Sequence, residues 1–246
     1  MMKPILIAVP VFNEEKHLAK VLREIRAVSR RRADILVVDD GSTDRTAEIL
    51  HHHGHVAHLN HDRNLGYGAS LIDAFNWAAR RQYSWVITMD CDEQHEPARL
   101  HDFFSAIDAD DADIISGSRY MNAALMHDLP PADRRRINML LTDVVNRNLY
   151  LDLTDTFCGY KAHRVDAVRR LKLTEPGYAF PMQFWVLCAR AGLAIRELPV
   201  DLIYNDPNRH FGGQLDNPDL RLRHYLNVFF TALNQTAPHA AMAAAC

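Results

Sequence analysis

The sequence contains few cysteines and no long apolar run. Its 246 residues include four cysteines, and none of them forms a CxxC pair. This pattern favours neither a disulfide framework nor a zinc site, and it suits a reducing, cytosolic setting. No stretch approaches the roughly 18 apolar residues of a membrane span, and the opening MMKPILIAVPVFNEE reaches proline and acids too soon for a signal peptide. We therefore expect a chain without a transmembrane segment.

A large excess of either charge is also missing. The formal net charge is -3 and the sequence pI is about 6.5, which argues against a protein dedicated to binding nucleic acid. The basic runs at residues 30–32 and 134–136 still allow local anion sites. What the chain does contain is a hydrophobic fraction of 48%, enough for one large globular domain with a substantial core.

Strand and helix patterns alternate through the first half of the chain, as in a mostly parallel α/β sheet with crossover helices on both faces. Behind the first strand, Asn13 is the predicted N-cap of a helix whose apolar residues recur at helical spacing from Leu18 to Val28. Short apolar runs predict strands at residues 5–10, 34–40, 56–60, 85–89 and 112–120.

From about residue 121 the rhythm changes. Residues 121–136 have no period and contain two prolines, which favours a loop over the sheet. A turn with a short strand at residues 154–163, a helix at 177–192 and a last strand at 193–204 are expected further on. Between them we predict a long amphipathic helix with one apolar face made of Ile137, Leu140, Leu141, Val144, Val145 and Leu149.

The last periodic segment, residues 218–230, places Leu222, Leu226 and Phe229 on one stripe of a helix, with basic residues alongside. Such a helix either lies on a membrane surface or packs on the core, and the pattern leaves both alternatives open. The alanine-rich tail from residue 236 is expected to be frayed.

Two acids stand at the end of the fourth predicted strand. In extended backbone, residues two apart point the same way, so Asp90 and Asp92 can present both carboxylates just past the carboxyl end of that strand. Ligands bind at this edge of open α/β sheets, and a hard cation such as Mg²⁺ or Mn²⁺ takes one or two carboxylates plus substrate phosphates. The pair therefore suggests a metal-bridged diphosphate, the alternative being a solvated acidic turn that caps the next helix.

A second acidic pair, Asp39 and Asp40, ends the second predicted strand before a glycine turn. Carboxylates accept hydrogen bonds from the N–H edge of a base or from ribose hydroxyls, so a nucleotide-reading site is one interpretation. An Asx-type turn followed by a helix cap is the other, and the segment DDGSTD alone does not separate them.

These separate signals combine into a resemblance. The segments VPVFNEE, VVDDGSTDRT, NLGYGAS, MDCDEQHEP, SGSRY and DLTDTFCGYKAH occur in the order and at about the spacing found in inverting family 2 glycosyltransferases of the GT-A fold. Within that family the chain is most similar to the branch of dolichol- and polyprenyl-phosphate mannose or glucose synthases. The resemblance implies one GT-A domain over residues 1–235, with a nucleotide-sugar-binding half at 1–120, an acceptor-binding half at 121–235 and a frayed tail at 236–246. Its nucleotide-sugar site would lie at the carboxyl ends of the strands.

The resemblance also implies roles for residues on the donor side. Gln94 matches the glutamine of the DxDxQHxP form and would join Asp90 and Asp92 in the shell of a divalent cation, Mg²⁺ or Mn²⁺. The other implied donor contacts are Pro10, Phe12 and Glu14 in the nucleoside pocket, Asp39 or Asp40 at the base, and Asp90 with Asp92 at the diphosphate.

On the acceptor side, the resemblance directs Arg119 at an acceptor phosphate, with Arg134 or Arg135 as a second phosphate-binding residue. Arg209 stands in the loop where the family carries a basic residue that closes on the donor diphosphate. The sequence departs from the family pattern there, because residues 210–212 are His, Phe and Gly and no lysine follows.

The chemistry that follows depends on the acceptor. A hydroxyl acceptor needs a general base, whereas an acceptor phosphate is already an anion and needs only positioning. Asp155, the acid of LTDTFCGYK, is expected to act as that base or as an orienting residue, and we expect Asp92 and Arg119 to stabilise charge on the leaving and accepting groups.

We therefore expect a metal-dependent glycosyltransferase that moves a hexose from a GDP-mannose or UDP-glucose type donor to a polyprenyl or dolichyl phosphate, as a peripheral enzyme on the cytoplasmic face of a membrane. One alternative keeps the enzyme class and changes the acceptor to a hydroxyl of a saccharide or small molecule. Another is a catalytically silent nucleotide-sugar-binding scaffold. A Rossmann dehydrogenase is disfavoured because no GxGxxG follows the first strand.

Overall fold

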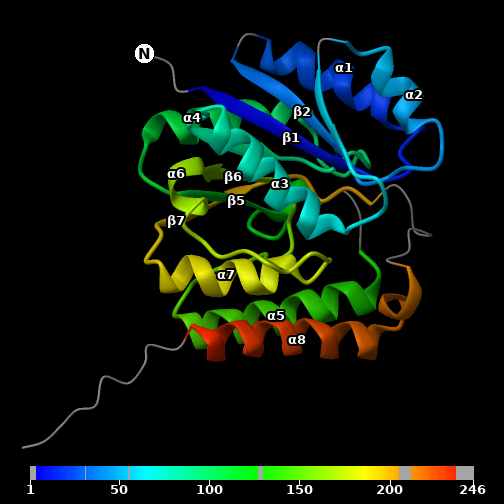
Figure 1. Ribbon diagram of the computed structural model, residues 1–246. Helices are drawn as coiled ribbons and strands as arrows, with labels where there is room; N and C mark the ends of the chain where they lie inside the picture. The colour runs from blue at the N-terminus through cyan, green and yellow to red at the C-terminus, as the bar shows by residue number, and fades with distance from the viewer. Residues whose placement is uncertain (1–3, 31, 55, 127–129, 205–211, 237–246) are drawn as a thin grey trace, which may run out of the picture.

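The computed structural model describes residues 4–30, 32–54, 56–126, 130–204 and 212–236 (Figure 1). Seven strands of these residues form one sheet in the order β3-β2-β1-β4-β6-β5-β7. β6 runs antiparallel to β4 and β5, and the other pairings are parallel, so the prediction of a mostly parallel sheet is confirmed. The strands are β1 (Ile5–Val11), β2 (Ala33–Asp39), β3 (Ala57–Asn60), β4 (Trp85–Thr88), β5 (Ile114–Ser118), β6 (Lys161–Arg164) and β7 (Ile195–Pro199).

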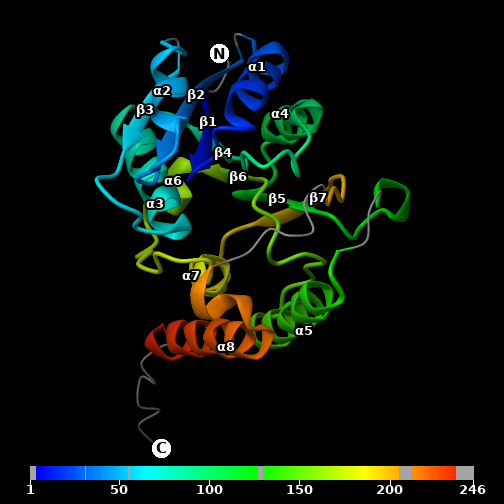
Figure 2. The same ribbon diagram turned by 90° about the vertical axis from the view of Figure 1, so that its right-hand side faces the viewer.

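Helices cover both faces of the sheet, as predicted, and two of them form a further layer. Figures 1 and 2 show α5 and α8 lying side by side beyond α7, on the side away from the sheet, and all three contact one another. The α-helices are α1 (Leu18–Ser29), α2 (Thr46–His51), α3 (Tyr67–Arg80), α4 (Leu100–Ala109), α5 (Ala132–Leu149), α6 (Val165–Val168), α7 (Phe180–Arg190) and α8 (Pro218–Gln235), and the short 3-10 helices are η1 (Pro97–Arg99), η2 (Ala123–Leu125) and η3 (Gly213–Asp216).

The core has two parts, one on each face of the sheet. Along β1, Ile5 and Ile7 pack into a cluster with α1, α2 and α4, whereas Leu6 and Ala8 pack into a cluster with α3, α6 and α7. The alternation follows from the two-residue period of a strand, and burial on both faces explains why β1 reads as a continuous apolar run.

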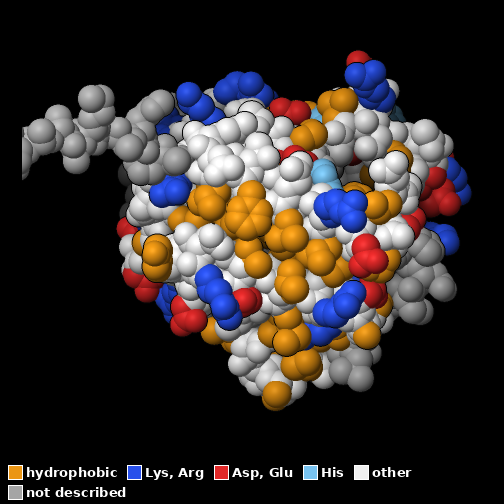
Figure 3. Space-filling view, turned by 90° about the horizontal axis from the view of Figure 1, so that it is seen from below, with side chains coloured by type: hydrophobic (Ala, Val, Ile, Leu, Met, Phe, Trp, Pro, Cys, Tyr) orange, Lys and Arg blue, Asp and Glu red, His pale blue; other side chains and the backbone are white. Residues whose placement is uncertain are grey.

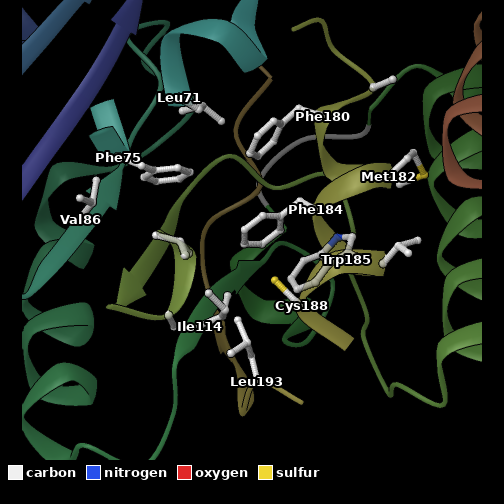
Figure 4. Packing of buried hydrophobic residues seen from close by; sticks show 14 of the residues in the cluster. Leu71, Phe75, Val86, Ile114, Phe180, Met182, Phe184, Trp185, Cys188 and Leu193 are labelled. Carbon is white, nitrogen blue, oxygen red and sulfur yellow. The ribbon is translucent and has the colours of Figure 1, made fainter. Parts of the chain in front are cut away.

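The cluster on the α7 face holds the segment that contains Asp155, a predicted site residue. Phe75, Phe180, Phe184 and Trp185 pack together between α3 and α7 (Figure 4). The indole Nε1–H of Trp185 donates to the carbonyl oxygen of Thr156 at 2.9 Å. This bond holds the chain directly beside Asp155.

The predicted helix start at Asn13 is wrong. Asn13 has φ of 56°, in the left-handed region that asparagine tolerates, and α1 begins only at Leu18. Its side-chain Oδ1 accepts from the backbone N–H of Thr43 at 2.8 Å and of Asp44 at 3.3 Å. Asn13 therefore joins the loop after β1 to the loop after β2 instead of capping a helix.

The predicted apolar face of the long helix α5 is too wide. Ile137, Leu141, Val145 and Leu149 are buried at a spacing of four, but Leu140 is 43% exposed and points away from the core. The rest of the buried face is polar, because Asn138 and Thr142 hydrogen-bond to the buried 155–156 segment.

The carboxyl-terminal helix α8 packs on the core, which decides between the two predicted alternatives. Tyr225 and Phe229 are buried, and Leu222 and Leu226 are partly buried against the same cluster, while Phe230 faces outward. None of the helices in the described parts of the chain combines the length and apolarity that crossing a membrane requires.

Candidate functional site

A large cavity of about 910 Å³ lies where the carboxyl ends of the parallel strands face α5 and α8. One wall follows β1, β2 and β4, and the opposite wall is made by α5, α8 and the loop before α7. Predicted site residues line both walls: Pro10, Phe12, Glu14, Asp40, Asp90, Asp92, Arg119 and Arg134.

Other predicted site residues lie outside the cavity lining. Asp39, Gln94 and Asp155 are not among its lining residues, and Arg135 lines a neighbouring groove instead. Arg209 lies outside the described residues.

The carboxylate of Asp90 is held from two sides. Its Oδ1 accepts from the hydroxyl of Tyr67 at 3.0 Å, and its Oδ2 lies 3.7 Å from Nε2 of His95. Because Nδ1 of His95 accepts from the backbone N–H of Asp90 at 3.0 Å, we assign the ring proton to Nε2, which faces that carboxylate. Burial, followed by the charge of Asp90, raises the pKa of Tyr67 well above its ordinary value, so its phenol remains a neutral donor.

Asp92 follows in a tight turn. Its Oδ1 accepts from the backbone N–H of Gln94 at 3.0 Å, and Glu93 between them adopts φ of 61°. The Glu93 carboxylate binds His17 Nδ1 at 2.9 Å and also Lys20 Nζ, and these bonds lower the pKa of Glu93. The loop that carries Asp92 is thus fastened to the start of α1.

The acid pair fits a divalent cation shared with a ligand. Asp90 and Asp92 both line the cavity, and both offer the carboxylate oxygens that Mg²⁺ and Mn²⁺ prefer. In the part of the chain that the structure describes, no group of three or more His, Cys, Asp or Glu residues forms a complete metal cage. A cation here would take its remaining ligands from a diphosphate and water, as hard cations at phosphate sites do.

The acids after β2 hold loops together. Asp40 is 4% exposed, and its Oδ1 accepts from His61 Nδ1 at 2.7 Å and from the backbone N–H of Leu65 at 2.8 Å, while its Oδ2 accepts from the N–H of Gly66 at 2.9 Å. Asp39 Oδ1 accepts from the N–H of Ser42 at 2.9 Å, closing a turn. The Asx-type turn that was one interpretation of this motif is therefore formed. Binding of a base by Asp39 or Asp40 stays a prediction.

On the other wall, Arg119 is fixed by a buried carboxylate. Arg119 Nε and Nη2 donate to the two oxygens of Asp155 at 2.6 and 3.0 Å, a bidentate pair. Asp155 also accepts from Asn138 Nδ2 at 2.9 Å and from the backbone N–H of Phe157 at 3.1 Å, and it is 0% exposed. Burial alone would raise the pKa of Asp155, but the charge and hydrogen bonds of Arg119 lower it to about 2.

The arginine run at the start of α5 divides between two surfaces. Arg134 lines the cavity, where its Nη1 donates to the hydroxyl of Tyr204 at 2.8 Å. The guanidinium of Arg135 instead stacks on the ring of Tyr120, 3.6 Å from its centroid. Arg134 is thus the member of this run whose charge faces the cavity.

Several cavity residues were not predicted from the sequence. Tyr67 and Tyr178 stack with 6.0 Å between ring centroids, and the buried Arg221 of α8 donates to Asp133 of α5 at 2.6 Å. The glycines beside Tyr67 in NLGYG were a usable signal, because a Cβ on Gly68 would come within 2.2 Å of the carbonyl oxygen of Glu175. Arg221 gave no such signal, since its partner lies 88 positions away.

Comparison with known proteins places this chain among glycosyltransferases. The family model described as Glycosyl transferase family 2 matches residues 6–172. An undecaprenyl-phosphate mannosyltransferase of Micrococcus luteus is 30% identical over 208 residues, which cover 81% of this chain and 83% of that protein. A polyprenol monophosphomannose synthase of Mycolicibacterium smegmatis is 28% identical over 204 residues, 79% of this chain and 76% of that protein.

Solved structures agree at the level of the fold. Glucosyl-3-phosphoglycerate synthase of Mycobacterium tuberculosis, in complex with Mn²⁺, UDP and glucosyl-3-phosphoglycerate, superimposes with a TM-score of 0.71 and 17% identity over 97% of this chain and 82% of that chain. Another crystal structure of that enzyme gives a TM-score of 0.73. The predicted GT-A fold is confirmed.

Proposed function

The chain belongs to glycosyltransferase family 2, and from that premise we propose that it moves a hexose, with inversion, from a GDP-mannose or UDP-glucose type donor to a polyprenyl phosphate. The names of the two relatives support the acceptor class. The complexes of the Mycobacterium tuberculosis enzyme with Mn²⁺ and UDP support a nucleotide donor and a divalent cation. A polyprenyl-phosphate acceptor implies work at a membrane surface, so we retain a peripheral enzyme on the cytoplasmic face.

The observation that carries the proposal is that the acid pair and the two predicted acceptor-binding arginines line one cavity. Asp90 and Asp92 lie on the wall formed by the strand ends, and Arg119 and Arg134 lie toward α5. The acids can bind a metal ion that carries the donor diphosphate, and the arginines can bind an anionic acceptor beside it. The donor half at residues 1–120 and the acceptor half at 121–235 would meet at this cavity.

On the donor wall, Asp90 and Asp92 would hold Mg²⁺ or Mn²⁺, with Gln94 as a further predicted ligand. Held by these residues, a divalent cation would supply positive charge that offsets the negative charge growing on the departing diphosphate. Pro10, Phe12 and Glu14 would surround the nucleoside, and Asp40 is the acid of its pair that lines the cavity beside them. Arg209 remains a predicted contact to the diphosphate.

On the acceptor wall, we assign Arg119 and Arg134 to the acceptor phosphate. Asp155 is given the orienting role and not the role of general base, because it has no exposed surface, accepts several hydrogen bonds and has a pKa near 2. With Asp155 locked in this way, an acceptor that is already ionised is favoured over a hydroxyl.

Two measurements test the proposal. A panel of sugar nucleotides is screened by thermal shift with and without Mn²⁺, and one base family should raise the unfolding temperature only when the metal is present. The matching donor, labelled in its sugar, is then incubated with polyprenyl phosphate, and label should move into the organic phase. Asp92→Ala should abolish both signals.

Other outcomes point to the rival functions. Label that passes to a water-soluble saccharide or small molecule would replace the lipid acceptor with a hydroxyl. Metal-dependent donor binding without hydrolysis or transfer to any acceptor would identify a nucleotide-sugar-binding scaffold.

A further inference from the structure

An open groove of about 640 Å³ lies on the outer side of α5, next to the cavity. Its lining is mostly apolar, with Met126 and Pro130 on the loop side and Met139 and Leu140 on the helix. Met139 and Leu140 are 56% and 43% exposed, so the groove leaves large apolar side chains uncovered. Figure 3 views the molecule from the side of α5 and α8 and shows hydrophobic side chains gathered there, with basic side chains among them.

The groove adjoins the acceptor end of the cavity. Pro130 lines both, and Arg135 in the groove stacks on Tyr120 of the cavity wall. A molecule with its phosphate at Arg119 and Arg134 could therefore extend past Pro130 into apolar surroundings. The chemistry of such a molecule is an anionic head followed by a hydrocarbon chain.

We propose that this groove binds the isoprene units of the acceptor lipid that follow the first one, with Met139 and Leu140 as its specificity-determining residues. The proposal rests on the proposed function, since it assumes a polyprenyl-phosphate acceptor. Methionine suits an irregular hydrocarbon chain because its unbranched side chain has three rotatable bonds, and leucine adds apolar surface beside it. Arg135 and Arg136 also line the groove and bring positive charge to it, which suits a lipid with an anionic head.

The test compares acceptors with and without a chain long enough to occupy the groove. Leu140→Asp is assayed with a long polyprenyl phosphate and with dimethylallyl phosphate, which has one isoprene unit. Losing the burial of one leucine predicts an increase of about 10-fold in KM for the long acceptor. KM for the donor and for the short acceptor should stay at the wild-type values.

Phe230→Asp is the matched control, because Phe230 is 42% exposed on the neighbouring helix α8 and lies outside the groove. An equal loss in both variants, or none in Leu140→Asp, would overturn the groove proposal and leave the proposed function standing. If the wild type transfers sugar to no polyprenyl phosphate, the proposed function falls and the groove proposal falls with it.

A separate observation on the donor wall concerns how Asp90 is aimed. The Tyr67 hydroxyl donates to Asp90 Oδ1, and Gly159 faces the other oxygen with no side chain in the way. A Cβ on Gly159 would lie 2.5 Å from Asp90 Oδ2 and 2.8 Å from the Tyr67 hydroxyl oxygen, both closer than real contacts allow.

We infer that Tyr67 is a positioning residue that, together with the space at Gly159, sets the direction of the Asp90 carboxylate for metal binding. Partners of this kind behind a metal ligand change metal affinity by about 10-fold to 100-fold when they are removed. The inference rests on the proposed function, in which Asp90 is a ligand of the cation.

Direct Mn²⁺ binding in the presence of GDP or UDP, followed by the electron paramagnetic resonance of free Mn²⁺, gives a readout other than activity. Tyr67→Phe should weaken Mn²⁺ binding about 10-fold with little change in the unfolding temperature without metal. Tyr83→Phe is the control, because it also removes a tyrosine to aspartate hydrogen bond, to Asp34 at 2.6 Å, away from the cavity. Asp90→Ala should abolish binding.

The outcomes separate the two assignments. If Tyr67→Phe binds Mn²⁺ like Tyr83→Phe while Asp90→Ala does not bind it, only the positioning role is wrong. If Asp90→Ala binds Mn²⁺ like the wild type, the metal assignment itself is wrong, and the role of Tyr67 is lost with it.

Discussion

The two walls of the cavity are built in different ways. On the donor wall, the acids directly follow β2 and β4, so the parallel ladder between β1, β2 and β4 places them at one edge. On the acceptor wall, Arg119 also follows a strand, but its direction is set by Asp155 and Asn138, which come from a loop and from α5. The backbone ladder therefore sets where the donor acids stand, with Tyr67 aiming the carboxylate of Asp90, whereas on the acceptor wall a buried carboxylate from a distant segment holds Arg119.

The difference predicts how each wall fails. Removing the charge of Asp90 or Asp92 should abolish function and leave the fold intact, because both carboxylates line the cavity. Disrupting the acceptor network should cost stability as well, because a buried charge would lose its partner.

The largest effect is expected for Asp92→Asn. The amide oxygen can still accept from the N–H of Gln94, so the turn should persist, but the charge that favours a cation is gone. Loss of metal stabilisation should lower kcat by about 10³-fold, and metal-dependent thermal stabilisation should vanish. Asp152→Asn, at an exposed position outside the cavity lining, is the control. A preserved metal-dependent shift in Asp92→Asn would contradict the donor-wall assignment.

Asp155→Asn should unfold more easily. It would leave the guanidinium of Arg119, whose side chain is 18% exposed, beside a neutral amide, at a cost of about 3 kcal/mol in the free energy of unfolding, the low end for a buried pair. Urea denaturation at neutral pH measures this. The matched control is Asp166→Asn, because Asp166 pairs with Arg169 at the surface, where such pairs contribute less than about 1 kcal/mol. Similar losses of unfolding free energy in the two variants would mean that the Arg119–Asp155 pair contributes no more to stability than a surface ion pair.

The same contrast explains what could be predicted from the sequence. The strands were predictable because β1, β2 and β4 are short apolar runs, and Asp90 and Asp92 were predictable because they directly follow one of these runs. Asn13 was assigned to the wrong role because its sequence fits a cap equally well, and its real partners, the N–H groups of Thr43 and Asp44, belong to another loop.

The acceptor wall was harder to predict because its contacts join distant segments. Asp155 was predicted to be a site residue, but its ion pair with Arg119, which is 36 positions away, was not predicted. Without that ion pair, the sequence could not show whether Asp155 acts as a general base or as an orienting residue. Leu140 was placed on the buried face because its type and spacing fit a helix stripe, whereas Asn138 occupies that face to reach Asp155. On this face of α5, buried polar residues that hydrogen-bond to one another stand at positions where helical spacing predicts apolar residues.

The pH dependence of stability should report on the same network. The pKa of Asp155 is lowered from 3.8 to about 2 in the folded protein, so the folded state favours the carboxylate. Its contribution is complete above pH 3.8 and is lost as the pH falls through about 2, a change of about 2 kcal/mol in the free energy of unfolding. Wild type and Asp155→Asn, measured by urea denaturation between these values, should converge as the pH falls. If the unfolding free energies of the two proteins instead fall in parallel with pH, the lowered pKa of Asp155 does not contribute to stability as proposed.

The smallest effect is expected for Glu93→Gln, which tests whether the donor wall depends on an ion pair of its own. Glu93 fastens the loop of Asp92 to His17 and Lys20, but its side chain is 23% exposed and Lys20 is 50% exposed, so water and salt screen the pair. We expect a loss below about 1 kcal/mol that disappears at high salt.

Thermal denaturation at low and high salt measures the Glu93→Gln effect, with Glu48→Gln, which breaks the exposed pair with Arg45, as the control. A loss comparable to that of Asp155→Asn would mean that the donor loop, too, is held by charge. An ion pair, and not the sheet edge, would then determine where the loop of Asp92 lies, and the contrast between the two walls would have to be abandoned.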